Sequence, residues 1–319
     1  MGKFKVLVAN STIPDIAHNI LKTECDVKVC EEGRESILQN IEGVDAMFWL
    51  SHYKLDKELL DKAGPQLKVI GSMSAGYDNV DVEELKKRGI KFGNTPGVLN
   101  DSVADMAVLL CLAASRRYIE GRQAIEQSLW KPELNAQWLL ARDICGSTVG
   151  IVGLGGIGLA VIHRLKCFNV AKFVYTGHKE KPEGKAVGAE FVSLDELLKT
   201  SDFVISCVPL NKETEKMFDA KAFSKMKSSA IFVNVSRGAT VNQPDLIAAL
   251  KEKRIFAAGL DVMTPEPLPP DHELLKLPNC FVTPHLGSAS TNTRNKMAEL
   301  AANNILNALK GQPMLTPVV

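Results

Sequence analysis

The sequence predicts an α/β protein with two domains, each built on a parallel β-sheet with helices on both faces. Strand-like and helix-like runs alternate along nearly the whole chain, which is the pattern of successive βα units. A strand, a glycine-rich turn and a helix follow one another at residues 148–165. With 319 residues, the chain is long enough for two hydrophobic cores.

The first region, up to about residue 95, alternates short β-branched runs with amphipathic ones. Strands are expected at Lys5–Ala9, Val27–Cys30, Ala46–Leu50, Val69–Met73 and Ile90–Phe92. Helices are expected between them, at Pro14–Leu21, Arg34–Ile41, Lys57–Lys62 and Val82–Lys87. The small-residue loop Ser72–Asn79 could present backbone amides to an anion, although the loop alone is better explained as a tight turn.

A long helix is expected from Asn100 to about Arg122, crossing from the first domain to the second. Ser102 stands three residues before Asp105, as in a capping box at a helix start. The segment from Trp130 to Ile144 then reads as a loop that displays Trp138. That indole either anchors an interface or packs under its own loop.

The glycine turn follows a β-branched strand and places Gly153, Gly155 and Gly158 in the G-x-G-x-x-G spacing. A dinucleotide pyrophosphate needs a tight turn, close approach of the backbone and free amides at a helix N-terminus. Gly156 and Ile157 complete the turn and belong to the same predicted site. Glycine turns also occur for structural reasons alone, but a strand before and a helix after favour the dinucleotide interpretation.

The second region continues the βα alternation to about residue 288. Strands are expected at Lys172–Thr176, Asp202–Val208, Ala230–Val235, Ala257–Val262 and Cys280–Thr283. Helices are expected at Leu194–Lys199, Ala220–Met226, Pro244–Lys253 and Ser290–Leu309. The last helix can return to the first domain, which gives a discontinuous domain of residues 1–99 and 289–319 around a doubly wound domain of residues 100–288.

The end of the second strand of the nucleotide domain indicates which dinucleotide is bound. NAD-binding domains place an acid there for the ribose 2′-hydroxyl. This chain has Thr176 instead, followed by a basic loop with His178, Lys179 and Lys181, which would attract a 2′-phosphate. The alternative is a solvated basic loop, and Glu180 weakens the signal. We therefore expect NADPH, with NADH as a weaker alternative.

Three further strand ends deliver Arg237, Glu266 and His285. Since ligands of open α/β sheets bind at the carboxyl ends of strands, these residues are expected to meet there. Arg237 could hold a carboxylate and a carbonyl by paired hydrogen bonds, and His285 could protonate the carbonyl oxygen as hydride arrives. Glu266 could orient the imidazole and favour its protonated form. Singly each residue is more often structural, but together they predict reduction of a keto acid.

The overall composition excludes several classes of function. The net charge of +1, with acids and bases interspersed, gives no sign of a nucleic-acid or membrane partner. Seven scattered cysteines predict reduced core thiols in a cytoplasmic protein, and six histidines show no zinc-ligand spacing, so no metal is expected.

These motifs together resemble the D-2-hydroxyacid dehydrogenases over nearly the whole chain. The resemblance rests on the glycine turn, Ser-Arg-Gly at 236–238, Gly-Leu-Asp-Val at 259–262 with Pro-Glu-Pro at 265–267, and Thr-Pro-His-Leu-Gly-Ser at 283–288. Within the family the chain looks most like the glyoxylate/hydroxypyruvate reductases. Tyr-Thr-Gly at 175–177, Val-Asn-Gln at 241–243 and Leu-Ala-Ala-Asn-Asn at 300–304 carry that nearer likeness.

The resemblance implies a Rossmann cofactor domain, a flavodoxin-like discontinuous substrate domain, a cleft between them and a homodimer. It assigns Arg237, Glu266 and His285 the roles above. It implies substrate contacts at Ala75, Gly76, Ser288 and Trp138, with Trp138 reaching the partner's active site. It places Pro209, Val235, Asp261 and Gly287 near the cofactor. Where related reductases carry arginines in the basic loop, this chain has His178 and Lys181, which predicts a weaker NADPH preference.

The sequence therefore predicts NADPH-dependent reduction of glyoxylate to glycolate and of hydroxypyruvate to D-glycerate. Two alternatives remain open. One is an NAD-dependent dehydrogenase for another D-2-hydroxy acid, such as D-lactate or D-3-phosphoglycerate. The other is a cofactor-sensing binding protein like the corepressors built on this scaffold.

Overall fold

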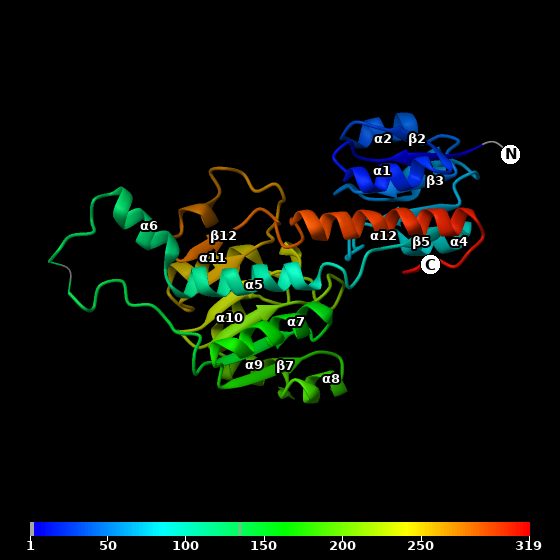
Figure 1. Cartoon of the computed structure of the whole chain (residues 1–319). Helices are drawn as coiled ribbons and strands as arrows, with labels where there is room; N and C mark the ends of the chain where they lie inside the picture. The colour runs from blue at the N-terminus through cyan, green and yellow to red at the C-terminus, as the bar shows by residue number, and fades with distance from the viewer. Residues whose placement is uncertain (1–2, 134) are drawn as a thin grey trace. The chain divides into compact units, whose positions relative to one another are not determined.

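The computed structural model describes residues 3–133 and 135–319, which divide into two compact units (Figure 1). Unit 1 comprises Met1–Leu99 with Ala289–Val319, and unit 2 comprises Asn100–Ser288. Each unit is an α/β structure with a wholly parallel sheet, so the predicted fold class is confirmed.

Unit 1 is built on a five-stranded sheet in the order β2-β1-β3-β4-β5. Its strands are β1 Phe4–Val8, β2 Cys25–Val29, β3 Ala46–Trp49, β4 Val69–Ser72 and β5 Lys91–Gly93. Its helices are α1 Asp15–Lys22, α2 Arg34–Asn40, α3 Lys57–Ala63, α4 Val82–Arg88 and α12 Thr291–Leu309. The predicted elements of this region are all present, with ends shifted by one or two residues.

Helix α12 and the segment after it complete unit 1. The helix, orange to red in Figure 1, packs along α1 and against β4. Its approach is close, because a Cβ at Gly71 of β4 would lie 2.6 Å from the Ala301 carbonyl oxygen. The chain end then runs beside β5, where Val318 donates its N–H to the Phe92 carbonyl and Phe92 donates to that of Val319. The return of the last helix to the first region is therefore present within unit 1.

Unit 2 is built on a seven-stranded sheet in the order β12-β11-β10-β9-β6-β7-β8. Its strands are β6 Thr148–Val152, β7 Lys172–Thr176, β8 Ala189–Phe191, β9 Phe203–Ser206, β10 Ile231–Asn234, β11 Ala257–Leu260 and β12 Cys280–Val282. Its helices are α5 Asn100–Ser115, α6 Tyr118–Glu126, α7 Gly156–Leu165, α8 Pro182–Ala186, α9 Leu194–Thr200, α10 Ala220–Lys225 and α11 Gln243–Lys251. Short 3₁₀ turns lie at Lys166–Phe168, Gly238–Thr240 and Glu273–Lys276.

The strand order places β6 at the topological switch point of unit 2. After β6 the chain runs outward through β7 and β8, and then returns to β9 on the other side of β6. Ligands of doubly wound sheets bind at the carboxyl ends of strands where this reversal occurs. The glycine turn, which follows β6 directly, therefore lies at the expected position for a ligand.

The start of unit 2 differs from the prediction in two respects. The helix expected from Asn100 to Arg122 is broken, because Arg117 has a left-handed backbone with φ of 54° and pairs with Glu120 in the first turn of α6. Ser102 is not a cap either. It lies inside α5 and donates its hydroxyl to the Gly287 carbonyl at 2.7 Å. Helix α5 lies entirely in unit 2, so it does not cross between the two units.

Smaller departures concern α8 and β8, which the sequence pattern missed, and the cysteines. All seven cysteines are free thiols. The prediction that they are core residues is wrong for Cys145 and Cys167, which are exposed. Burial raises the pKa of the Cys280 thiol to about 12. Among the described residues, no helix combines the length and the apolar character needed to cross a membrane.

Candidate functional site

The glycine turn after β6 is shaped by different requirements at its three glycines. Gly153 has φ of +96°, and a Cβ there would lie 2.9 Å from Val208. A Cβ at Gly158 would lie 2.6 Å from the Gly153 carbonyl oxygen, so this glycine lets α7 pack against the turn. Gly155 meets no protein atom within 4 Å and has an ordinary extended backbone with φ of −94°. The protein therefore needs glycine at 153 and 158 for its own packing, and at 155 only if something else approaches.

The turn opens helix α7, whose first residues are Gly156 and Ile157. A helix of ten residues presents unpaired amides at its N-terminus, which favours an anion there. Gly156 lies against a side chain, because a Cβ there would come 2.2 Å from the Asn100 carboxamide, which would have to move aside. Asn100 thus belongs to the turn, a role that the sequence pattern did not suggest. These features fit a dinucleotide pyrophosphate.

The loop after β7 carries the basic residues expected near a ribose 2′-phosphate. Thr176 closes β7, and its carbonyl accepts the N–H of Gly153, which ties the loop to the glycine turn. His178 and Lys179 are exposed, and Lys181 donates its ammonium to the Leu154 carbonyl at 2.8 Å. An acidic residue that the sequence analysis did not identify lies nearby: Glu213 Oε2 is 3.8 Å from His178 Nδ1. The loop is basic, but Glu213 offsets part of its charge.

Arg237 follows β10 at the carboxyl edge of the sheet. Its backbone is fixed because its carbonyl accepts hydrogen bonds from Asn234 Nδ2 at 3.0 Å and Thr240 Oγ1 at 2.8 Å. The guanidinium is half-buried and donates from Nη1 to the Ser236 carbonyl. Val235 is buried beside it, and Pro209 follows the neighbouring strand β9.

Glu266 and His285 are paired directly. His285 Nδ1 lies 2.7 Å from Glu266 Oε2, and Glu266 Oε1 accepts the N–H of Met263 at 3.0 Å. Burial tends to raise the pKa of Glu266, but the hydrogen bond and charge of His285, the Met263 amide and the charge of Arg237 together lower it below its ordinary value. The carboxylate is thus held ionised against the imidazole, and Nε2 is the ring nitrogen that Glu266 does not occupy.

The loop that carries His285 is held by Asp261, which is buried at the end of β11. Its carboxylate accepts from the N–H groups of Leu286 and Gly287 and from the Thr283 hydroxyl, each at 2.7 Å. His285 has φ of 55°, a left-handed conformation that costs a non-glycine residue about 1–3 kcal/mol and persists only where the surroundings impose it. The hydrogen bonds of Asp261 supply that constraint, so Asp261 holds the loop that positions His285. Ser288 follows the loop and is half-buried.

The loop after β4 in unit 1 contains Ala75 and Gly76. Within the part of the chain that the structure describes, neither backbone N–H donates to a protein acceptor. The loop carbonyls are occupied instead, since Asn94 Nδ2 donates to Ala75 O at 2.7 Å and Thr95 N to Ser74 O at 2.8 Å. Sequence reasoning missed Asn94 and Thr95, because a contact across 19 residues leaves no local pattern.

Trp138 lies in the segment after α6, and its side chain is partly exposed. The predicted loop from Trp130 to Ile144 has no helix or strand among its described residues, and position 134 lies outside them. Together with α6 this segment projects from the sheet of unit 2, at the left of Figure 1 where α6 is labelled.

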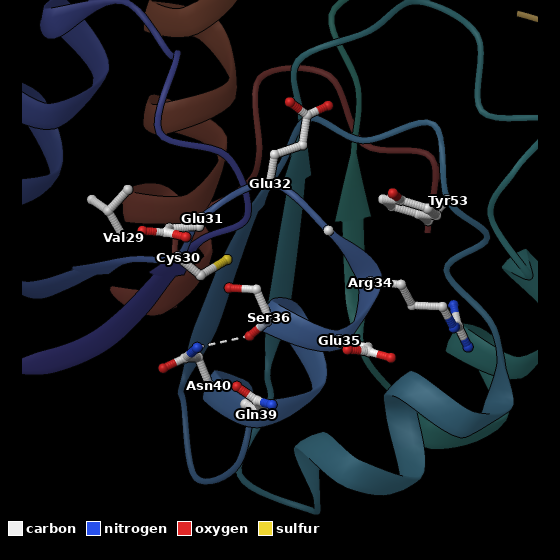
Figure 2. A pocket seen from close by; sticks show the side chains of 11 residues that line it. Val29, Cys30, Glu31, Glu32, Arg34, Glu35, Ser36, Gln39, Asn40 and Tyr53 are labelled. Atoms are coloured by element: carbon white, nitrogen blue, oxygen red, sulfur yellow. Dashed lines mark hydrogen bonds between the residues drawn. The ribbon is translucent and has the colours of Figure 1, made fainter. Parts of the chain in front are cut away.

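Unit 1 also has a recess of about 750 Å³ beside α2. Figure 2 shows that Glu31, Glu32 and Glu35 line it. Arg34 also lines it, but its guanidinium is already paired with Asp56 and Glu58. The three carboxylates would therefore repel a keto-acid anion, so this recess does not suit such a substrate.

A doubly wound sheet with a glycine turn at its switch point and a histidine–carboxylate pair near an arginine defines a dinucleotide-linked oxidoreductase. Residues 108–287 match the model of the D-isomer specific 2-hydroxyacid dehydrogenase NAD binding domain. The human glyoxylate reductase/hydroxypyruvate reductase is 47% identical over 280 residues, covering 86% of this chain and 84% of the relative. The glyoxylate reductase of Thermofilum pendens is 42% identical, covering 98% of this chain and 93% of the relative. The chain belongs to the D-isomer-specific 2-hydroxyacid dehydrogenase family.

A solved structure agrees with this assignment. The NADPH-dependent glyoxylate/hydroxypyruvate reductase of Sinorhizobium meliloti, in complex with NADP and malonate, superposes with a TM-score of 0.85. It is 31% identical, and the match covers 100% of this chain and 97% of that one. The family resemblance drawn from the motifs is confirmed, including the likeness to glyoxylate/hydroxypyruvate reductases.

Proposed function

We propose that this protein reduces small 2-keto acids with NADPH, converting glyoxylate to glycolate and hydroxypyruvate to D-glycerate. The observation that carries the proposal is the 2.7 Å pair of His285 and Glu266, at the sheet edge where Arg237 also lies. The names of the relatives from human, Thermofilum pendens and Sinorhizobium meliloti support the choice of substrate.

In the proposed reaction, the nicotinamide supplies the hydride when the cofactor is bound. Arg237 binds the keto-acid carboxylate and carbonyl oxygen through its planar fork. His285 donates the proton at Nε2 to the carbonyl oxygen, while Glu266 holds Nδ1 and stabilises the imidazolium. The N–H groups of Ala75 and Gly76 bind the carboxylate, and Ser288 lines the same pocket.

The cofactor part of the proposal assigns the pyrophosphate to Gly153, Gly155 and Gly158 with the start of α7. The 2′-phosphate is assigned to Thr176, His178, Lys179 and Lys181, and Pro209, Val235 and Gly287 are assigned to the nucleotide's surroundings. We expect the preference for NADPH over NADH to be modest, because the Glu213 carboxylate beside His178 repels a 2′-phosphate.

A homodimer is also part of the proposal. The arm formed by α6 and the following segment carries exposed apolar side chains and a recess of about 560 Å³. These exposed side chains are Tyr118, Ile125, Leu129, Trp130, Trp138 and Leu140. Such a set on one extended segment is typical of a protein interface, and Trp138 would then reach the partner's site. The free cysteines support a cytoplasmic location.

The decisive experiment is steady-state kinetics on glyoxylate, hydroxypyruvate and pyruvate with NADPH and with NADH. We expect the highest kcat/KM for the first two substrates with NADPH, and turnover in the usual range of about 1–10³ per second. A higher kcat/KM with NADH or with pyruvate would reject the cofactor or substrate assignment. No turnover of any keto acid would favour a cofactor-sensing binding protein.

A further inference from the structure

The loop after β4 is held in place through its carbonyl groups. Thr95 N donates to Ser74 O at 2.8 Å, Asn94 Nδ2 to Ala75 O at 2.7 Å, and Ser74 Oγ to Gly76 O at 2.6 Å. In a planar trans peptide, the carbonyl and the N–H of the next residue point in opposite directions. Holding the carbonyls of Ser74 and Ala75 therefore fixes the directions of the Ala75 and Gly76 N–H groups.

Asn94 is itself fixed by the end of the chain. Its carbonyl accepts from Thr316 Oγ1 at 2.6 Å and from Asn304 Nδ2 at 3.3 Å. Asn304 is fully buried in α12, and its Oδ1 accepts the N–H groups of Leu315 and Thr316 at 2.8 and 3.1 Å. A chain of hydrogen bonds thus runs from the C-terminal segment through Asn304 and Asn94 to Ala75.

We propose that Asn94 is a positioning residue for substrate binding, which aims the Gly76 N–H at the substrate carboxylate through its hydrogen bond to Ala75 O. The inference rests on the proposed function, which assigns the carboxylate to the amides of Ala75 and Gly76. Asn94 does not touch the substrate in this arrangement. Its effect is on the geometry and polarisation of one peptide group, so it acts on substrate capture and not on proton transfer.

The test compares Asn94→Ala with Asn40→Ala, a matched control. Asn40 also lies in unit 1 and also donates through Nδ2 to a main-chain carbonyl at 2.7 Å, that of Ser36 in α2. For Asn94→Ala we expect the KM for glyoxylate to rise about fivefold to tenfold, the usual worth of one such hydrogen bond. The dissociation constant of oxalate, a dianion that competes for the same amides, should rise by a similar factor. The kcat, the KM for NADPH and all constants of Asn40→Ala should stay within about twofold of the wild type.

The outcomes separate this inference from the function on which it rests. A folded Asn94→Ala protein with unchanged KM for glyoxylate, or with a loss confined to kcat, overturns the positioning role. If the wild type reduces no keto acid, the proposed function fails, and the oxalate titration alone decides the role of Asn94. If Asn94→Ala shows no cooperative unfolding, Thr316→Val decides in its place. That variant removes the hydroxyl bond to Asn94 and should raise the KM about twofold to threefold, whereas an unchanged KM rejects the inference.

Discussion

The carboxyl edges of the two sheets present different kinds of groups. In unit 2 the edge presents ionisable side chains, Arg237, Glu266 and His285, beside the glycine turn. In unit 1 the edge presents main-chain amides at Ala75 and Gly76, while the side chains of Ser74 and Asn94 hold the carbonyls. Proton transfer needs a titratable group, whereas capture of a carboxylate needs only oriented N–H donors. We therefore expect changes at His285 to act on kcat, changes in the glycine turn to act on cofactor affinity, and changes in the loop of unit 1 to act on substrate KM.

The largest effect should come from His285→Gln in unit 2. Glutamine keeps a polar side chain but cannot act as a general acid, so we expect kcat for glyoxylate to fall by about 10²–10⁴. The affinity for NADPH, measured by fluorescence titration, should stay unchanged. A near-normal kcat would show that His285 is not the general acid, and it would also reject the proposed contrast between the two sheet edges.

A smaller effect is expected when alanine replaces two glycines of the same turn: one substitution should lower NADPH affinity and the other should lower stability. At Gly155 an added methyl meets no protein atom within 4 Å, so Gly155→Ala should keep or slightly raise the free energy of unfolding. It should weaken NADPH binding about tenfold or more, because the proposed site brings the pyrophosphate close to the backbone there. At Gly158 the methyl would lie 2.6 Å from the Gly153 carbonyl oxygen, so Gly158→Ala should cost about 1–3 kcal/mol of stability.

Urea unfolding with and without NADPH measures both variants, and each serves as the control of the other. Full NADPH affinity in Gly155→Ala would remove Gly155 from the proposed pyrophosphate site, and a loss of stability would show that packing also requires this glycine.

Sequence reasoning located those features that are defined by side-chain type and local spacing, and the structure pairs two of them, Glu266 and His285. The glycine turn and the three strand ends can be read because glycine spacing, arginine, glutamate and histidine are visible in the letters themselves. The alternation of strands and helices likewise predicts both sheets, because a buried parallel strand needs a run of β-branched residues.

The remaining features depend on contacts between distant residues or on backbone conformation. Asn94 reaches Ala75 across 19 positions and Asn304 across 210, so neither partner is visible in a local window. The helix break at Arg117 depends on a left-handed backbone at a residue with no intrinsic preference for it. Asp261 is present in the motif, but its support of the His285 loop is a matter of three-dimensional geometry.

The smallest effect concerns the Glu266–His285 pair as an ion pair. Because the pKa of Glu266 is lowered in the folded protein, its ionised form stabilises the fold above the ordinary glutamate pKa. That contribution is lost as the pH falls through the lowered value. His285 and Glu266 are 37% and 24% exposed, so solvent screening limits the effect to at most about 1 kcal/mol.

We expect the free energy of unfolding of the wild type to exceed that of Glu266→Gln near neutral pH, and the difference to vanish in acid. Glu42→Gln, which removes the exposed partner of Lys62, is the control and should show almost no difference. Urea unfolding of the three proteins from pH 7 to about pH 3 measures this, since the range spans the ordinary glutamate pKa of about 4.3. A difference that grows as the pH falls would mean that Glu266 is held protonated, and an acid of that kind could not stabilise an imidazolium at His285. The proton donor at the edge of unit 2 would then need another negative charge to stabilise its protonated form.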